Sequence, residues 1–331
     1  MIITRTPFRI SFFGGGTDYA PWYREHGGAV LATTINKYCY ISCRHLPPFF
    51  DHKHRIVYSR IENVTHNDEI EHPAVKAVLN WSNVDEGLEI HHDGDLPARS
   101  GLGSSSSFTV GLLNALRGLN GRMSSKEGLA KEAIHVEQNV IGENVGSQDQ
   151  VSAAFGGFNL IEFHRNDSFD VSPVIMPVER REELRDHLML CFTGFSRIAS
   201  EIAKSKIDNL RKRETALLRM RNMVDEGVAV LQDCSQPIDS FGKLLDESWH
   251  YKRKLSERVS TPEIDEIYET AMEAGAIGGK ILGAGGGGFL LIFAKSEKQA
   301  AIRARLSKLI YVPFDFEDSG SKVVVYQPNG L

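Results

Sequence analysis

Hydrophobic and polar residues alternate over residues 2–13, which predicts a β-strand at the start of the chain. Thr, Ile, Tyr and Val are concentrated over residues 30–43 and predict a second strand. Residues 45–72 are polar, which indicates loops and edge strands, and a further short strand is expected over residues 88–92. The chain is therefore predicted to begin with a β-sheet.

Apolar residues at helical spacing predict three helices in the next stretch. The first is expected to begin after the serine run 104–107. The second opens at residues 124–127, where Ser-Ser-Lys-Glu has the spacing of a capping box, and it runs to about Ile141. The third is short and starts near Ser147, and residues 158–163 return to a strand.

Periodicity is interrupted over residues 165–180, which predicts a boundary between a first domain of residues 1–175 and a second of residues 176–331. Beyond the interruption, the elements are predicted in the order strand, helices, strand, helix, strand, and the last strand covers residues 322–326. This order indicates an α+β fold in which a small sheet is covered by helices.

Composition narrows the function mainly by exclusion. The 331 residues carry 38 Lys and Arg against 43 Asp and Glu, a formal charge of −5, so no basic surplus favours a nucleic-acid backbone. Neither a membrane-spanning segment nor a signal peptide is expected from the hydropathy pattern. The four cysteines lack metal-ligand spacing, so free thiols in a reducing, cytoplasmic setting are expected.

Glycine is the residue with the unusual distribution. A third of the 30 glycines lie in three short runs, at residues 14–16, 101–103 and 283–288. The last run matches the pattern GxGxxG, but a helix is expected before it and a strand after it. Dinucleotide-binding sites require the reverse order, so this match is misleading. The runs are therefore either tight turns or loops that wrap an anion.

The middle run favours anion binding. Residues 97–107 lead into an amphipathic helix, whose N-terminus has free N–H groups and the positive end of the helix dipole. Glycines before a helix let the backbone wrap a phosphate, and a serine hydroxyl can coordinate Mg²⁺. A serine N-cap with a flexible lead-in remains the alternative.

Phosphoryl transfer also requires acidic groups, one to hold a metal ion and one to orient or deprotonate the attacking hydroxyl. Glu137, inside the second predicted helix, and Asp149, near the start of the third, are the candidates. Taken singly, each is also compatible with an exposed acid or with a charge near a helix N-terminus.

Three motifs in a fixed order resemble those of the GHMP small-molecule kinases. They are TPFRISFFGGGTDY at residues 6–19, the segment 97–107, which fits PxxxGLxSS, and KILGAGGGG at residues 280–288. The Gly-Gly-Gly-Thr-Asp-Tyr form of the first motif, together with residues 192–200, is similar to the branch that phosphorylates D-glycero-D-manno-heptose 7-phosphate. The resemblance spans nearly the whole chain.

The resemblance implies a ribosomal S5-like, ATP-binding first domain, a ferredoxin-like second domain, and an active site between them. It implies an ATP- and Mg²⁺-dependent kinase that acts on the anomeric hydroxyl of a sugar phosphate. The best candidate reaction converts D-glycero-α-D-manno-heptose 7-phosphate to the 1,7-bisphosphate for bacterial nucleotide-activated heptose synthesis. The implied partners are these small molecules, with no nucleic acid or membrane, and a homo-oligomer is left open.

Carried over to matching positions, the resemblance assigns roles to individual residues. Asp149 would be the general base, and Arg9 would keep it ionised. Mg²⁺ would be held by Glu137 and by Ser105, a choice that the run of four serines leaves open by one position. The substrate-binding residues would be Gly15, Gly16, Thr17, Asp18 and Arg197. The ATP-binding residues would be Pro97, Arg99, Ser100, Gly101, Leu102, Gly103, Ser104, Ser105, Ser106, Gly285 and Gly286.

One departure from the family pattern bears on the substrate. Galactokinases carry Glu-His before the Thr-Asp of the first motif, where this chain has Gly15-Gly16, and this argues against galactose. A sugar phosphate requires a cationic subsite, and the candidates that no spacing rule separates are Arg24, Lys37, Arg99 and Arg197.

Two alternative functions stay open. The chain could be another anomeric sugar kinase, such as a fucokinase-like enzyme, or a sugar and ATP sensor without catalysis. The intact set of Arg9, Ser105, Glu137 and Asp149 argues against the sensor.

Overall fold

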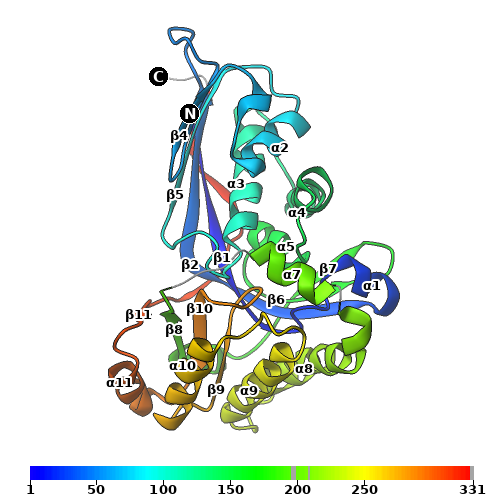
Figure 1. The fold of residues 1–331 in the computed structure, drawn as a ribbon, viewed down its shortest axis with the longest axis vertical. Coiled ribbons are helices and arrows are strands. Elements are labelled where there is room, and N and C mark those ends of the chain that lie inside the picture. The colour runs from blue at the N-terminus through cyan, green and yellow to red at the C-terminus, as the bar shows by residue number, and fades with distance from the viewer. Residues whose placement is uncertain (195–198, 208, 329–331) are drawn as a thin grey trace.

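The computed structural model describes residues 1–194, 199–207 and 209–328. These residues form two β-sheets with helices packed around them (Figure 1), which confirms the predicted α+β class. The nine-stranded sheet contains β1 (Ile2–Phe13), β2 (Gly28–His45), β3 (His54–Val57), β4 (Ile61–Val64), β5 (Leu88–Gly94), β6 (Phe158–Phe163), β7 (Phe169–Pro173), β12 (Phe316–Glu317) and β13 (Lys322–Tyr326). The four-stranded sheet contains β8 (Leu188–Phe192), β9 (Gly278–Ile281), β10 (Phe289–Phe293) and β11 (Ile310–Tyr311).

The helices of the described chain fall on both sides of the point where the two sheets meet (Figure 1). They are α1 (Ala20–His26), α2 (Pro73–Trp81), α3 (Ser104–Leu119), α4 (Lys126–His135), α5 (Gln148–Phe155), α6 (Val178–His187), α7 (Ala199–Ile207), α8 (Glu214–Gln232), α9 (Asp239–Arg253), α10 (Pro262–Glu273) and α11 (Ser296–Arg305). Short turns of other helical types are η1 (Asn67–Glu69), η2 (Val136–Ile141) and η3 (Leu210–Arg213). None of the described helices is long and apolar enough to cross a membrane.

The antiparallel strands β1 and β2 form the centre of the first sheet, whose order is β13-β1-β2-β5-β3-β4. β2 is long enough to pair with β6 through its first part and with β5 through its second. α3 packs along these strands, and the Thr4 hydroxyl donates to the Gly111 carbonyl at 2.9 Å. Glycine permits this approach, because a Cβ at position 111 would lie 2.9 Å from the Thr6 hydroxyl oxygen. The serine-rich start of α3 is thereby fixed relative to β1.

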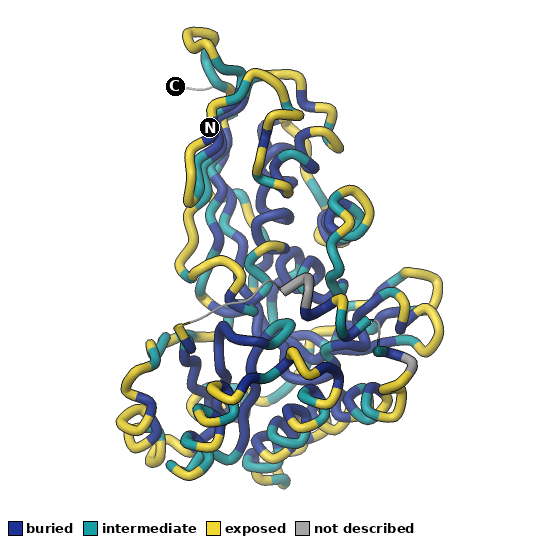
Figure 2. Tube along the Cα trace, viewed as in Figure 1, coloured by how far each residue is buried: buried dark blue, intermediate teal, exposed yellow. Residues whose placement is uncertain are grey.

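The second sheet is antiparallel in the order β11-β8-β10-β9, and every residue of the apolar strand β10 is buried. α9 packs against β9, and its Phe241 makes edge-to-face contacts with Phe12 and Phe13 at the end of β1. Buried residues therefore continue from one sheet to the other, as Figure 2 shows in dark blue around the junction of the two halves. This shared core fixes the positions of the two sheets relative to each other at their junction.

The last strand belongs to the first sheet rather than the second. β13 pairs antiparallel with β1, and β12 pairs with β2. The pattern of residues 322–326 correctly predicted a strand, but grouping it with the small second sheet was wrong, because strand partners depend on long-range pairing. The division of the chain at residues 175 and 176 stays a prediction.

The structure also moves two predicted helix boundaries. α3 begins at Ser104, so the serine run forms its first turn instead of preceding it. The second predicted helix is α4, whose N-cap is Ser125, one residue later than the Ser124–Glu127 capping-box spacing predicted, and Ser125 Oγ accepts from the Gly128 N–H. It continues into the π-helical turn η2, which carries Glu137. The helices α1, α2 and α6 were not predicted, since each is short and follows a polar or glycine-containing stretch.

Candidate active site

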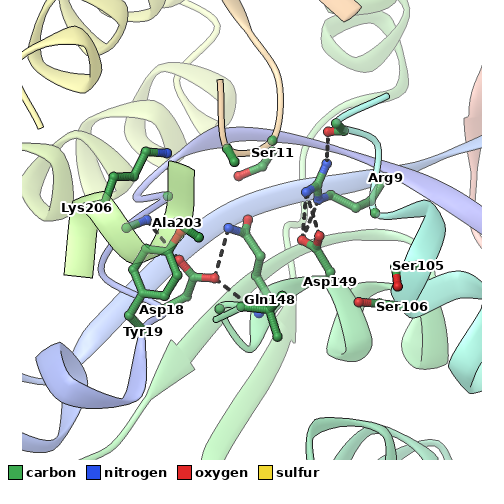
Figure 3. A pocket seen from close by; sticks show the side chains of 18 of the residues that line it. Arg9, Ser11, Asp18, Tyr19, Ser105, Ser106, Gln148, Asp149, Ala203 and Lys206 are labelled. Carbon is green, nitrogen blue, oxygen red and sulfur yellow. Dashed lines mark hydrogen bonds and ion pairs between the residues drawn. The ribbon is translucent and has the colours of Figure 1, made fainter. Parts of the chain in front are cut away.

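A cavity of about 220 Å³ lies where the two halves of the molecule meet. The first half contributes β1, the loop after it, the loop before α3 and the segment before α5, and the second half contributes α7, α9, β9 and the last glycine run. Figure 3 shows part of this lining, with Asp18 and Asp149 on either side of Gln148. The lining residues that the sequence had singled out are Arg9, Gly15, Gly16, Asp18, Arg99, Gly101, Gly103, Ser104, Ser105, Ser106 and Asp149.

Arg9 and Asp149 form a bidentate ion pair in this cavity (Figure 3). Arg9 Nε donates to Asp149 Oδ1 and Nη2 donates to Oδ2, each at 2.8 Å. The Arg9 side chain is only 4% exposed and also donates to the Gly101 carbonyl at 2.6 Å, whereas the Asp149 side chain is 26% exposed. The buried guanidinium therefore holds the carboxylate in one orientation, and the exposed part of the carboxylate remains accessible to a ligand in the cavity. A carboxylate held in this way is positioned to accept a proton from a bound hydroxyl.

Asp18 is buried in the cavity wall. Its Oδ1 accepts from the Gly16 N–H at 2.8 Å, and its Oδ2 accepts from the Gln148 side-chain amide at 3.0 Å. Burial raises the pKa of Asp18, and the negative charge of Asp149 adds to this. Position 146 requires glycine, because a Cβ there would lie 1.9 Å from Asp18 Oδ2. The carboxyl group is thus held by both loops that flank the cavity.

Thr17, which was predicted to bind substrate, does not line the cavity. Its buried hydroxyl lies 2.8 Å from the Gly14 carbonyl and 2.9 Å from the Ala29 carbonyl, and it accepts from the Ala29 N–H at 3.1 Å. Gly14 has no room for a side chain, because a Cβ would lie 1.9 Å from the Ala29 carbonyl oxygen. Thr17 and Gly14 therefore attach the turn to β2, and the turn presents Gly15 and Gly16 to the cavity.

The first turn of α3 faces the cavity through Ser104, Ser105 and Ser106. Its N-cap residue, Gly103, has a φ of 75°, and no side chain in the described chain caps the helix. The N–H groups of this turn are therefore free to bind an anion, as the sequence predicted for the middle glycine run. Gly103 also lies next to the ion pair, since a Cβ there would lie 3.4 Å from Asp149 Oδ2.

Within the segment 97–107, three of the residues predicted to bind ATP do not line the cavity. The Ser100 carbonyl accepts from the Phe289 N–H, and the Leu102 carbonyl accepts from the Arg9 N–H, both at 3.0 Å. Ser100 and Leu102 are buried, so they attach the loop to its neighbours, while Pro97 is exposed outside the cavity. The motif is contiguous in sequence, but its backbone alternates between the cavity and the core.

The last glycine run packs mainly against protein. A Cβ on Gly283 would lie 2.5 Å from the Gly101 Cα, and one on Gly288 would lie 2.2 Å from the Ser100 carbonyl oxygen. Gly285 and Gly286, which were predicted to bind ATP, lie against Val259 instead, with the Gly286 N–H donating to its carbonyl at 2.8 Å. Gly283 and Gly288 bring the last glycine run into backbone contact with the loop before α3. Gly283 and Ala284 are the members of the run that line the cavity.

Gly283→Ala should therefore be more damaging than a glycine substitution that introduces backbone strain alone. Gly121 is the matched control, because both residues have a φ of +65° but nothing lies within 4 Å of a Cβ at position 121. We expect Gly121→Ala to cost about 1 kcal/mol of stability, and Gly283→Ala to cost at least about 2 kcal/mol more. Thermal unfolding measures the difference, and kcat/KM for ATP should fall at least about tenfold in Gly283→Ala alone. Equal Tm values for the two variants would contradict the contact argument.

Glu137 is completely buried behind the serine turn. Ser106 Oγ donates to its Oε2 at 2.9 Å, and the Gln150 side-chain amide donates to the same oxygen. Burial raises the pKa of Glu137 to about 7, although these donors oppose the shift. Its second oxygen, Oε1, has no hydrogen-bond partner among the described residues.

The donor set around Glu137 fits Mg²⁺, which takes carboxylate and hydroxyl oxygens. Ser106 both lines the cavity and contacts Glu137, whereas no contact between the Ser105 side chain and Glu137 is found in the described chain. Of the serines that the sequence left open, the geometry therefore favours Ser106 over Ser105 as the partner of Glu137.

Three buried lysines in the lining were missed by the sequence analysis, namely Lys206, Lys252 and Lys280. Lys252 donates to the Ile281 and Gly283 carbonyls at 2.6 Å, and Lys280 donates to the Phe12 carbonyl at 2.7 Å. Burial lowers the pKa of Lys206 to about 8, that of Lys280 to about 7, and that of Lys252 well below its ordinary value. Lys280 begins the third motif and could have been noted, but no sequence signal marks the other two.

The cations that the sequence proposed for a second phosphate are less well placed. Arg24 pairs with Asp167 on the surface, Lys37 is half-buried on β2, and neither lines the cavity. Arg99 does line it, in a left-handed backbone conformation with a φ of 58°. Arg197 lies outside the described residues.

Models of known protein families match the chain in two places. The model described as GHMP kinases N terminal domain matches residues 70–157, and the model described as GHMP kinases C terminal matches residues 230–311. Between them, the two matches include the serine turn, Glu137, Asp149 and the last glycine run.

Individual relatives align over most of the chain. D-glycero-alpha-D-manno-heptose 7-phosphate kinase of Campylobacter jejuni is 31% identical over 97% of this chain and 98% of that protein. The bifunctional fucokinase/GDP-fucose pyrophosphorylase of Arabidopsis thaliana is 26% identical over 91% of this chain but only 31% of its own length. The solved structure of a D-glycero-D-manno-heptose 1-phosphate kinase from Bacteroides thetaiotaomicron has a TM-score of 0.80 and 24% identity, covering 99% of this chain and 100% of that one.

The matches to both family models and the similarity to this solved structure confirm the two-domain GHMP kinase fold that the sequence motifs predicted.

Proposed function

Since the chain belongs to the GHMP kinase family and is an ATP-dependent sugar kinase, we propose that it phosphorylates the C1 hydroxyl of a sugar phosphate. The proposed substrate is D-glycero-α-D-manno-heptose 7-phosphate, and the product is the 1,7-bisphosphate. The observation that carries this proposal is the full-length similarity to a kinase named for that substrate. Two features agree with it, namely the cations that line the cavity and Gly15, where the absence of a side chain leaves space beside Ser11 and Gln148 for a large sugar.

We propose that Asp149 accepts the proton of the C1 hydroxyl as that oxygen attacks the γ-phosphorus of ATP. A C1–O–P bond forms while the bond from the γ-phosphorus to the bridging oxygen breaks, and ADP leaves. Arg9 holds both carboxylate oxygens of Asp149, so the acceptor edge keeps one orientation during the transfer. The N–H groups of the α3 first turn bind the phosphates and stabilise the negative charge that develops on them. Asp18 binds sugar hydroxyls from the opposite side of Gln148.

Glu137 and Ser106 are the residues that would hold Mg²⁺. The ion, when bound, neutralises phosphate charge and orients the triphosphate. We place this reaction in the cytoplasm, where ATP is available, and the bisphosphate would feed the synthesis of a nucleotide-activated heptose.

A substrate panel tests the proposal. The purified protein is given ATP, Mg²⁺ and, in turn, the heptose 7-phosphate, the unphosphorylated heptose, L-fucose and D-galactose, and ADP release is followed. We expect the heptose 7-phosphate to have the highest kcat/KM by at least about 100-fold, with a second phosphorus signal in the product spectrum. Turnover of L-fucose at a comparable rate would support the fucokinase alternative instead, and no turnover of any sugar would favour a sensor.

A further inference from the structure

We propose that Lys206 binds the phosphate group that the sugar substrate already carries, and so determines the preference for a sugar phosphate over a free sugar. The inference rests on the proposed function, because it assumes a substrate with a phosphate remote from the reacting hydroxyl. It assigns that phosphate to α7, an element that none of the three sequence motifs includes.

The position of α7 gives Lys206 access to the cavity. The helix lies at the front of the junction between the two halves in Figure 1, and Ala203, one helical turn before Lys206, lines the same cavity. Figure 3 shows the Lys206 side chain extending from α7 at the end of the cavity where Tyr19 lies, with its nitrogen directed away from Tyr19 and Asp18 in this view. Because Lys206 is among the lining residues, its side chain borders the space that a sugar would fill.

Lys206 differs from the other two cavity lysines in its hydrogen bonds. The ammonium groups of Lys252 and Lys280 already donate to backbone carbonyls. Lys206 is 5% exposed, yet no acceptor for its ammonium group is found in the described chain. A cation that lines a cavity in a largely buried position, without a hydrogen-bonded partner, would be stabilised by an anionic group bound in that cavity.

Asp18 is the acid that acts on Lys206 electrostatically, but its oxygens are engaged by the Gly16 N–H and the Gln148 amide. Burial also raises the pKa of Asp18, which reduces its value as a permanent counter-ion. Lys206 therefore retains positive charge and hydrogen-bonding capacity for a ligand. A phosphate monoester, with up to two negative charges and three terminal oxygens, matches both properties.

The order of groups along the cavity fits a substrate that carries its phosphate far from C1. In Figure 3, Lys206 and Tyr19 lie at one end, Asp18 and Gln148 in the middle, and Asp149 with Ser105 and Ser106 at the other end. A sugar whose C1 hydroxyl meets Asp149 would extend past Asp18 toward Lys206. In a heptose 7-phosphate, C7 is the chain end opposite C1, so its phosphate would arrive at the free ammonium group.

Lys206→Met tests the inference, since methionine keeps the length and apolar stem but removes the charge. We expect KM for the heptose 7-phosphate to rise about 10- to 100-fold, as expected for loss of a charged hydrogen bond, with a small change in kcat. The kcat/KM for the unphosphorylated heptose should change less than about threefold. Lys204→Met is the matched control, because it removes an exposed charge from the same helix and should leave both substrates unaffected.

Two further variants protect the test against a folding defect. Lys206→Arg keeps the charge and should stay closer to the wild-type KM than Lys206→Gln, which keeps polarity alone, and Tm is measured for each. If every Lys206 variant keeps the wild-type ratio of kcat/KM for phosphorylated over free heptose, the inference is overturned while the proposed function stands. If the wild-type protein itself shows no preference for the phosphorylated sugar, the proposed function fails first, and Lys206 has no phosphate to bind.

Discussion

Asp149→Asn is expected to lower kcat by about 10²- to 10⁴-fold with the heptose 7-phosphate, because an amide cannot accept the proton of the attacking hydroxyl. The substitution keeps the shape of the side chain and one oxygen for Arg9, so ATP should still bind with a KM close to that of the wild type. Steady-state kinetics and a single-turnover experiment measure the effect, and the latter separates the chemical step from product release. The expected signature is therefore a loss in kcat without a comparable change in the KM for ATP.

The control must distinguish a lost base from a disturbed cavity. Glu143→Gln makes the same acid-to-amide change in the same lining, at a residue that is not part of the Arg9–Asp149 ion pair, and should lower kcat less than tenfold. Asp149→Asn also leaves the buried Arg9 guanidinium without a full counter-charge, so a lower Tm is expected and must be measured. A kcat within tenfold of the wild type, in a folded Asp149→Asn protein, would rule out general-base catalysis by this residue.

The sequence was most informative where a motif constrains its own backbone. The glycines and serines near the start of α3 predicted an anion-binding helix N-terminus, and the structure shows that turn uncapped and facing the cavity. The resemblance to the kinase family was equally useful, because it predicted that Arg9 acts on Asp149 although 140 residues separate them in the sequence. Neither periodicity nor composition predicts such a contact, which depends on how β1 and α5 pack.

The sequence was least informative about which members of a motif face a ligand. Thr17, Gly285 and Gly286 belong to motifs that reach the cavity, yet each contacts protein because the backbone turns between neighbouring residues. The opposite situation holds for Lys206 and Lys252, which lie outside the three motifs but line the cavity where the two halves pack together. Lysine is ordinarily exposed, and whether a particular lysine is buried depends on tertiary packing. The burial of Lys206 and Lys252 therefore could not be predicted from the sequence.

Glu137→Gln is expected to raise the Mg²⁺ concentration needed for half-maximal activity about 10- to 100-fold and to lower kcat about 100-fold at saturating Mg²⁺. The physical reason is that Oε1 of Glu137 is buried without a hydrogen-bond partner among the described residues, which leaves a carboxyl oxygen for a cation. Glutamine has the same shape and keeps an oxygen acceptor, but it removes the negative charge that attracts a divalent ion. Binding of Mn²⁺ in the presence of ADP, followed by electron paramagnetic resonance, gives a second measurement that does not depend on turnover.

Ser106→Ala and Ser105→Ala form a matched pair that separates the two serines. Both residues lie in the first turn of α3 and line the cavity, but the hydrogen bond to Glu137 comes from Ser106. We therefore expect Ser106→Ala to raise the Mg²⁺ requirement about tenfold and Ser105→Ala to change it less than about threefold. The reverse order would assign the metal to Ser105, as the motif alone suggested, and would mean that the Ser106–Glu137 contact gives way when Mg²⁺ binds. An unchanged Mg²⁺ requirement in Glu137→Gln as well would contradict any role of this carboxylate in holding the ion.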